Sequence, residues 1–374
     1  MSGADTSVFG QETAIWDHFL HTSQPASRRT ELVSSEDWNE LIAARIVRPQ
    51  QRLCMPIVTR IPWDQKLLGL QSKQAIALQH IAAQTGIGWV GNSPSADPDG
   101  FSSGFWILPV EGDQLPTAEQ LRRADAVEFQ WLGATATASS RVAQPPFDGV
   151  DAYRLARKFR ALRSMLGKAT KLGIAIPIGS VEQDTAWAID MGFDFLTLLQ
   201  PRLATGADAP SFGIPAPLAI RLARRQATLS KQPHWPIFVE AAIRNGLDLA
   251  KGLSMGATGV IIDRSYLLTQ ATNSRSGGSQ GHSPSSSFRS EPMGDWDAER
   301  PRATATSPFR DWLMRIAKEL HQTLQTVGID ELHHLEATSL AAIEPSIAKL
   351  FHVASLLDSP SSAVAEPSRP RSKS

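Results

Sequence analysis

The sequence predicts an α/β fold, a (β/α)8 TIM barrel with helical extensions at both ends. From Leu53 onward, short apolar runs alternate with longer segments of helical periodicity, which is the pattern of βα units around a parallel sheet. The alternation continues to Leu268. A barrel of this kind typically needs about 250 residues. The region supplies a similar length, so the expected barrel domain covers 51–268.

The apolar runs indicate eight strands, of which Phe105–Val110 is either a barrel member or an excursion from it. The expected strands are Leu53–Thr59, Gly86–Gly91, Phe105–Val110, Ala126–Leu132, Gly173–Ile178, Phe193–Leu199, Pro236–Glu240 and Gly259–Ile262. The expected helices between them are Ser72–Gln84, Thr117–Arg123, Asp151–Leu166, Val181–Met191, Ala216–Thr228 and Leu247–Met255.

Four further segments flank the barrel. Scattered apolar residues such as Trp16 and Trp38 predict a helical extension over 1–50. Residues 269–308 are rich in Ser, Gly and Pro, and a segment of that composition cannot bury enough apolar surface to offset its ordering entropy, so we expect a disordered insertion. Apolar residues at i, i+3 and i+4 spacing predict C-terminal helices over 309–357 that pack on the barrel. A disordered tail is expected over 358–374.

Composition excludes several classes of function. The 374 residues include 37 Lys+Arg and 37 Asp+Glu, so the formal net charge is 37 − 37 = 0, which argues against a nucleic-acid partner. The single cysteine, Cys54, excludes an intrachain disulfide framework, a Cys-rich zinc module and a self-contained iron–sulfur site. No apolar stretch reaches the roughly 18 residues of a membrane span, and the first residues do not resemble a secretory signal. We therefore expect a soluble cytoplasmic protein.

The loops after strands seven and eight are the candidate anion site. In such barrels these loops often hold a phosphate. The first loop contains Arg244, Asn245 and Gly246 and leads into a helix whose free amides attract anions. The second contains Arg264, a forked donor for phosphate. An equally open alternative is that Arg244 and Arg264 are ordinary surface or ion-pair residues.

Several segments resemble FMN-dependent barrels. The run IFVEAAIRNGLDLAKGLSMGATGVIIDRSYLL (237–268) is similar to their last units, including those of glutamate synthase and flavin-type isopentenyl diphosphate isomerase. The segments LATGADAPSFGIP (203–215) and GFWILPVEGDQLPTAEQLRRADAVEFQWLGATATA (104–138) resemble the glutamate synthase family more specifically. Residues 67–94 are weakly similar to it as well. The resemblance implies a bound FMN whose reduced form delivers hydride to an imine of a 2-oxo acid.

The departures from the family fall on its functional residues. Gln130 stands where the family has a strand-four lysine, and Ala241 and Ala242 stand where a glycine approaches the phosphate. The stretch after strand eight, which in glutamate synthases carries cluster cysteines, has none here. Because these cysteines are missing, we expect no iron–sulfur cluster. Their absence also excludes a complete glutamate synthase of the usual form.

Two hypotheses follow. The first is a glutamate synthase-like, FMN-dependent oxidoreductase acting on a small substrate of the amino acid or 2-oxo acid (imine) type. Its expected flavin contacts are Gln130 near the ring and Thr205, Gly206, Arg244, Asn245, Gly246 and Arg264 at the phosphate. No catalytic acid or base and no metal ligand can be named. The second hypothesis, of equal weight, is a catalytically inactive barrel that serves as a structural or regulatory partner of a homologous protein.

Overall fold

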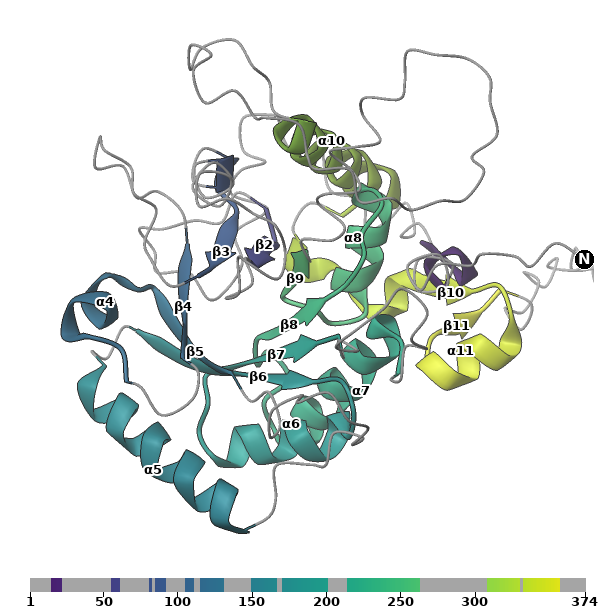
Figure 1. Cartoon of the computed structure of the whole chain (residues 1–374). Coiled ribbons are helices and arrows are strands. Elements are labelled where there is room, and N and C mark those ends of the chain that lie inside the picture. The colour runs from purple at the N-terminus through teal and green to yellow at the C-terminus, as the bar shows by residue number, and fades with distance from the viewer. Residues whose placement is uncertain are drawn as a thin grey trace, which may run out of the picture.

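The computed structural model of the chain describes residues 15–21, 55–60, 81–82, 85–91, 105–110, 115–130, 149–166, 170–200, 214–262, 308–329 and 332–356. Its centre is a closed barrel of eight strands in sequence order (Figure 1). The strands are β2 (Ile57–Arg60), β3 (Gly88–Val90), β4 (Trp106–Val110), β5 (Ala126–Gln130), β6 (Lys171–Pro177), β7 (Phe195–Leu199), β8 (Ile237–Glu240) and β9 (Gly259–Ile262). The predicted TIM barrel is confirmed.

All neighbouring barrel strands are parallel, and the ring closes between β2 and β9, where Ile57 pairs with Val260 and Thr59 with Ile262. The strand over Trp106–Val110 is a barrel member, because it pairs with β3 on one side and β5 on the other. The excursion considered from the sequence is therefore wrong. Every strand thus presents its carboxyl end at the same end of the barrel, which we call the mouth.

The lower part of the lumen is filled by apolar side chains. Alternate residues of each strand point inward. Phe195 and Phe238 meet edge to face there, with ring centroids 5.8 Å apart. Gly173 makes room for them, since a Cβ atom at that position would overlap the Phe195 ring. The inward apolar cluster comprises Val58, Val90, Phe105, Ile107, Ala126, Phe195, Phe238 and Ile261. The lumen below the mouth is therefore a packed core.

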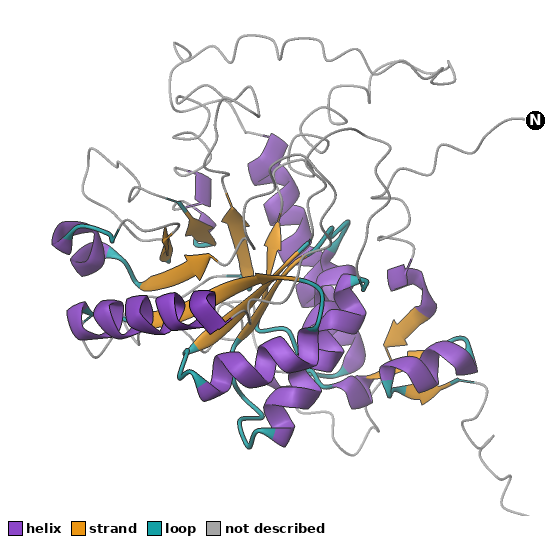
Figure 2. Ribbon diagram, turned by 60° about the horizontal axis from the view of Figure 1, so that its bottom comes forward, coloured by secondary structure: helices purple, strands orange, loops and turns teal. Residues whose placement is uncertain are grey.

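Helices surround the barrel (Figure 2). They are α4 (Ala118–Arg123), α5 (Gly149–Met165), α6 (Val181–Asp190), α7 (Ala216–Leu229) and α8 (Gly246–Ser254). Each lies within two residues of a predicted helix. Thr117 begins α4 with a capping box, in which its hydroxyl accepts from the Gln120 amide and the Gln120 side chain accepts from the Thr117 amide.

The two ends of the described chain meet in a small sheet beside the barrel (Figure 1). Strand β1 (Phe19–His21) follows the short helix η1 (Ile15–His18) and pairs antiparallel with β10 (Leu340–Ala342), which pairs parallel with β11 (Ala354–Ser355). The sequence predicted a helical extension over 1–50, and Phe19–His21 differs because its backbone hydrogen bonds go to a strand more than 300 residues away. The C-terminal helices are α10 (Pro308–Val327) and α11 (Pro345–Phe351), with the short turns η3 (Leu332–His334) and η4 (Ala337–Ser339) between them.

The expected insertion over 269–308 lies outside the described residues up to position 307, and the tail over 358–374 lies outside them entirely. The segments that follow β6 and β8 are described in full, whereas those that follow the other barrel strands are not. At the mouth, the structure therefore describes complete loops after β6 and β8. None of the described helices combines the length and the apolar character needed to cross a bilayer.

Candidate functional site

Polar side chains replace the apolar packing of the lumen at the mouth. Arg60 ends β2, Glu128 and Gln130 lie on β5, Thr197 lies on β7 and Glu240 ends β8. All five side chains are buried, with Gln130 the most exposed at 8%. In barrel enzymes this is the end where the chemistry takes place.

Glu128 is the centre of this polar layer. Arg60 Nη2 donates a 2.6 Å hydrogen bond to Glu128 Oε1, and Thr197 Oγ1 donates one of 2.6 Å to Oε2. The Glu128 side chain is fully buried and that of Arg60 is 7% exposed. A buried carboxylate is tolerated when a cation and further donors compensate its lost hydration. The pair therefore places a fixed dipole at the mouth.

Two further acceptors border this pair. Glu240 Oε2 accepts a 3.1 Å hydrogen bond from the Gln200 amide, which joins the ends of β7 and β8. Gln130, the residue expected near a flavin ring, lies two positions after Glu128 and so faces the same side of β5. The mouth thus contains an amide, a guanidinium and two carboxylates.

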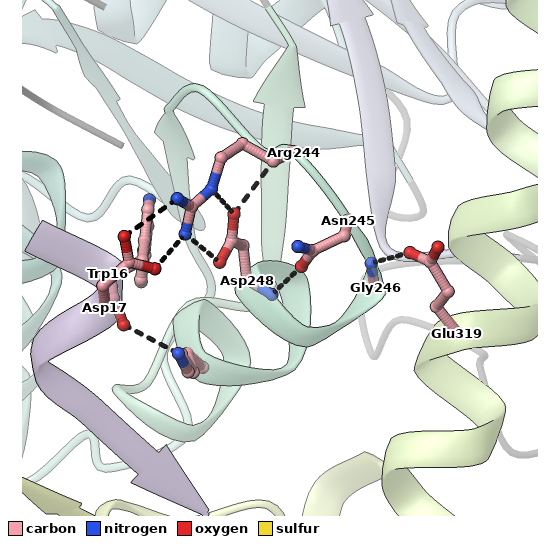
Figure 3. Close-up of polar contacts among 8 residues, drawn as sticks. Trp16, Asp17, Arg244, Asn245, Gly246, Asp248 and Glu319 are labelled. Carbon is pink, nitrogen blue, oxygen red and sulfur yellow. Dashed lines mark hydrogen bonds and ion pairs between the residues drawn. The ribbon is translucent and has the colours of Figure 1, made fainter. Parts of the chain in front are cut away.

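Three other predicted residues, Arg244, Asn245 and Gly246, meet at the amino end of α8 (Figure 3). Asn245 caps the helix, since its Oδ1 accepts a 2.9 Å hydrogen bond from the Asp248 amide. Arg244 Nε donates to Asp248 Oδ2 at 2.7 Å, and its Nη2 donates to Asp17 Oδ1 at 2.7 Å. Hydrogen bonds to Asp248 and Asp17 raise the pKa of Arg244, and Arg244 in turn lowers the pKa of Asp17. Arg244 therefore ties the N-terminal segment to α8.

The remaining contacts of α8 are also with other parts of the chain. The Gly246 amide donates a 2.8 Å hydrogen bond to Glu319 Oε2 of α10 (Figure 3). Lys251 Nζ donates to the Trp16 carbonyl at 2.7 Å, and burial lowers the pKa of this lysine. Helix α8 is thus held between η1 on one side and α10 on the other.

The structure brings together three of the predicted site residues and places a fourth apart from them. Arg244, Asn245 and Gly246 form one turn, and Gln130 lies in the lumen. For Arg244, the ion-pair alternative raised from the sequence describes what is observed. Thr205, Gly206 and Arg264 lie outside the described residues.

Sequence reasoning missed Arg60, Glu128, Thr197 and Glu319. A signal for Glu128 was present, because it shares one face of the strand with Ala126 and Gln130, whereas Val127 and Phe129 take the opposite, apolar face. Glu319 gave no such signal, since its polar side chain breaks no sequence pattern and its partner lies 73 residues away. Within the described ranges, no group of three or more His, Cys, Asp or Glu side chains could hold a metal ion.

No protein-family model and no curated protein matches this chain. Solved structures do resemble it. A soluble mutant of the membrane-associated (S)-mandelate dehydrogenase from Pseudomonas putida aligns with a TM-score of 0.54 at 15% identity, covering 90% of this chain and 91% of that one. A mandelate oxidase mutant with a monooxide FMN adduct aligns with a TM-score of 0.53 at 13% identity, covering 89% of this chain and 90% of that one. A mutant flavocytochrome b2 with benzoylformate aligns with a TM-score of 0.53 at 13% identity, covering 90% of this chain and 79% of that one. At these identities the likeness shows the fold.

Proposed function

We propose that this protein is an FMN-dependent oxidoreductase that acts on a small 2-hydroxy or 2-oxo acid at the mouth of its barrel. The observation that carries the proposal is the closed barrel itself, which aligns over about nine-tenths of the chain with barrels whose names include an FMN adduct and a 2-oxo acid ligand. The narrower version, a glutamate synthase-like enzyme acting on an imine, rests on the sequence motifs around 104–138 and 203–215.

The described residues of the mouth fit the ring end of a flavin. Gln130 offers both a donor and an acceptor for the edge of a pyrimidine ring, and Arg60 offers a cation whose charge Glu128 balances. When bound, FMN would supply the redox chemistry, and the protein would supply orientation and electrostatics. The apolar layer below the mouth excludes water from the lumen side.

The phosphate end is divided between two loops in this proposal. Thr205, Gly206 and Arg264 are the proposed phosphate contacts. Arg244, Asn245 and Gly246 would instead shape the turn after β8, because their polar groups already bond to Asp17, Asp248 and Glu319.

Anaerobic mixing tests the proposed reaction. The FMN-loaded protein is mixed with lactate, mandelate, glutamate and glycerol, and the visible flavin absorption is followed. We expect an acid to bleach the flavin and the alcohol, which lacks a carboxylate, to leave it oxidised. A flavin that stays oxidised with every acid would contradict the proposed activity even if FMN binds.

A catalytically inactive barrel is the second candidate. The observation that favours it is the turn after β8, where the Arg244 side chain makes four hydrogen bonds to two carboxylates of the chain itself. This reading predicts a colourless protein that co-purifies from its native cell with a stoichiometric homologous partner. Recovery of free monomer would contradict it.

A further inference from the structure

The amino end of α8 already carries an anion. The first amides of a helix point outward without intrahelical partners, and the helix dipole makes this end positive. The Glu319 carboxylate lies there, with Oε2 2.8 Å from the Gly246 nitrogen (Figure 3). A carboxylate in this position makes the same kind of contact with the helix that a ligand phosphate would make.

Packing holds Glu319 in place. Helix α10 lies directly against the first turn of α8, and a Cβ atom on Gly246 would overlap the backbone of Leu320. The face of α10 that contacts the barrel is a buried apolar stripe, comprising Phe309, Trp312, Leu313, Ile316, Ala317, Leu320, Leu324 and Val327. Moving the backbone of Glu319 away from α8 would require moving this stripe out of the core, which costs about 25 cal/mol for each Å² of apolar surface exposed.

Two neighbouring backbone donors of the turn are also occupied. The Asp248 amide donates to the Asn245 side chain, and the Arg244 amide donates to Asp248 Oδ2 at 3.2 Å. The Asp248 carboxylate beside them, which is 1% exposed, would repel a second anion. This turn is therefore built as a joint between α8, η1 and α10.

We infer that Glu319 is the resident anion at the amino end of α8, so that the Gly246 amide gives a cofactor phosphate no hydrogen bond. The consequence rests on the proposed function: the preference of the protein for FMN over riboflavin, which lacks the phosphate, would not depend on Glu319.

Paired titrations test the cofactor consequence. FMN and riboflavin are titrated separately into the full chain and into the Glu319→Gln variant, which keeps an acceptor but removes the charge. We expect the ratio of the two dissociation constants to agree within about threefold between the two proteins. An FMN preference that increases by more than about threefold in Glu319→Gln would show that the phosphate competes with Glu319 for α8 and would overturn the inference.

Thermal melts separate this inference from the proposed function. Glu319→Gln is expected to lower Tm by about 1–2 °C, because a charge next to a helix end is lost. An unchanged Tm for Glu319→Gln would contradict a resident anion. If neither flavin binds, the proposed function fails while these melts still decide the role of Glu319.

Discussion

At the scale of single residues, buried charged groups affect the stability of the fold, because their burial costs free energy unless a partner compensates the charge. Glu128 is compensated by Arg60 and Thr197. Asp184, on the inner face of α6, differs, because its Oδ1 finds no hydrogen-bond partner among the described residues and burial raises its pKa to about 6. Removing the charge of Glu128 should therefore lower the free energy of unfolding, whereas removing that of Asp184 should raise it near neutral pH.

Removing one member of the Arg60–Glu128 pair should destabilise the barrel. Glu128→Met leaves a buried guanidinium without its carboxylate, and breaking such a pair costs about 3–5 kcal/mol. The double variant Arg60→Met, Glu128→Met removes both charges and should recover most of that free energy of unfolding. Urea denaturation of Arg60→Met, Glu128→Met and the double variant measures the coupling. Additive losses would show that the two side chains do not act as a pair.

The Asp184 carboxyl should make stability depend on pH. Its folded pKa of about 6 lies above the ordinary value of 3.8 for an aspartate, so the folded state binds this proton more tightly than the unfolded state does. The protonated Asp184 carboxyl makes its full contribution to the free energy of unfolding below pH 3.8. This contribution is lost as the pH rises through about 6. Asp184→Asn lacks this loss, so its Tm relative to wild type should increase by about 3 °C between pH 4 and pH 8. A Tm difference that does not vary with pH would contradict this assignment.

At the scale of elements, α8 shows what the sequence could and could not predict. Its apolar periodicity predicted the helix to within one residue at each end. Its neighbours could not be predicted, because the contacts join distant parts of the chain: Asp17 lies 227 residues from Arg244, and Glu319 lies 73 residues from Gly246. The same limit applies to β1, whose strand conformation depends on pairing with β10.

Two glycines of α8 provide a matched test of this packing. Gly246→Ala would force a methyl group into the backbone of α10, and overpacking of this kind costs about 1–3 kcal/mol. Gly252→Ala would place its methyl 3.5 Å from the Trp16 ring, an ordinary contact, and should stabilise the helix by up to about 1 kcal/mol. Tm values of the two variants should therefore move in opposite directions. Equal shifts would mean that α10 does not pack on the first turn of α8.

At the scale of the whole molecule, the barrel was predictable because every βα unit repeats the same local pattern. The boundaries of the strands were less predictable. Lys171 begins β6 by pairing with Ala126, although a polar, exposed residue gives no strand signal. The candidate site was only partly predictable: Gln130 faces the lumen through simple alternation, whereas the bond from Arg60 to Glu128 joins strands that are not neighbours in the barrel.

The central claim is that the barrel binds FMN at its mouth, and a fluorescence titration tests it most directly. Increasing amounts of the flavin-free protein are added to FMN, with Gln130→Leu as the comparison because it removes the amide proposed to contact the ring. We expect flavin emission to change until the protein and FMN are equimolar, and the variant to bind about tenfold more weakly, as for a lost hydrogen bond. FMN emission that is unchanged by the wild-type protein would contradict the claim.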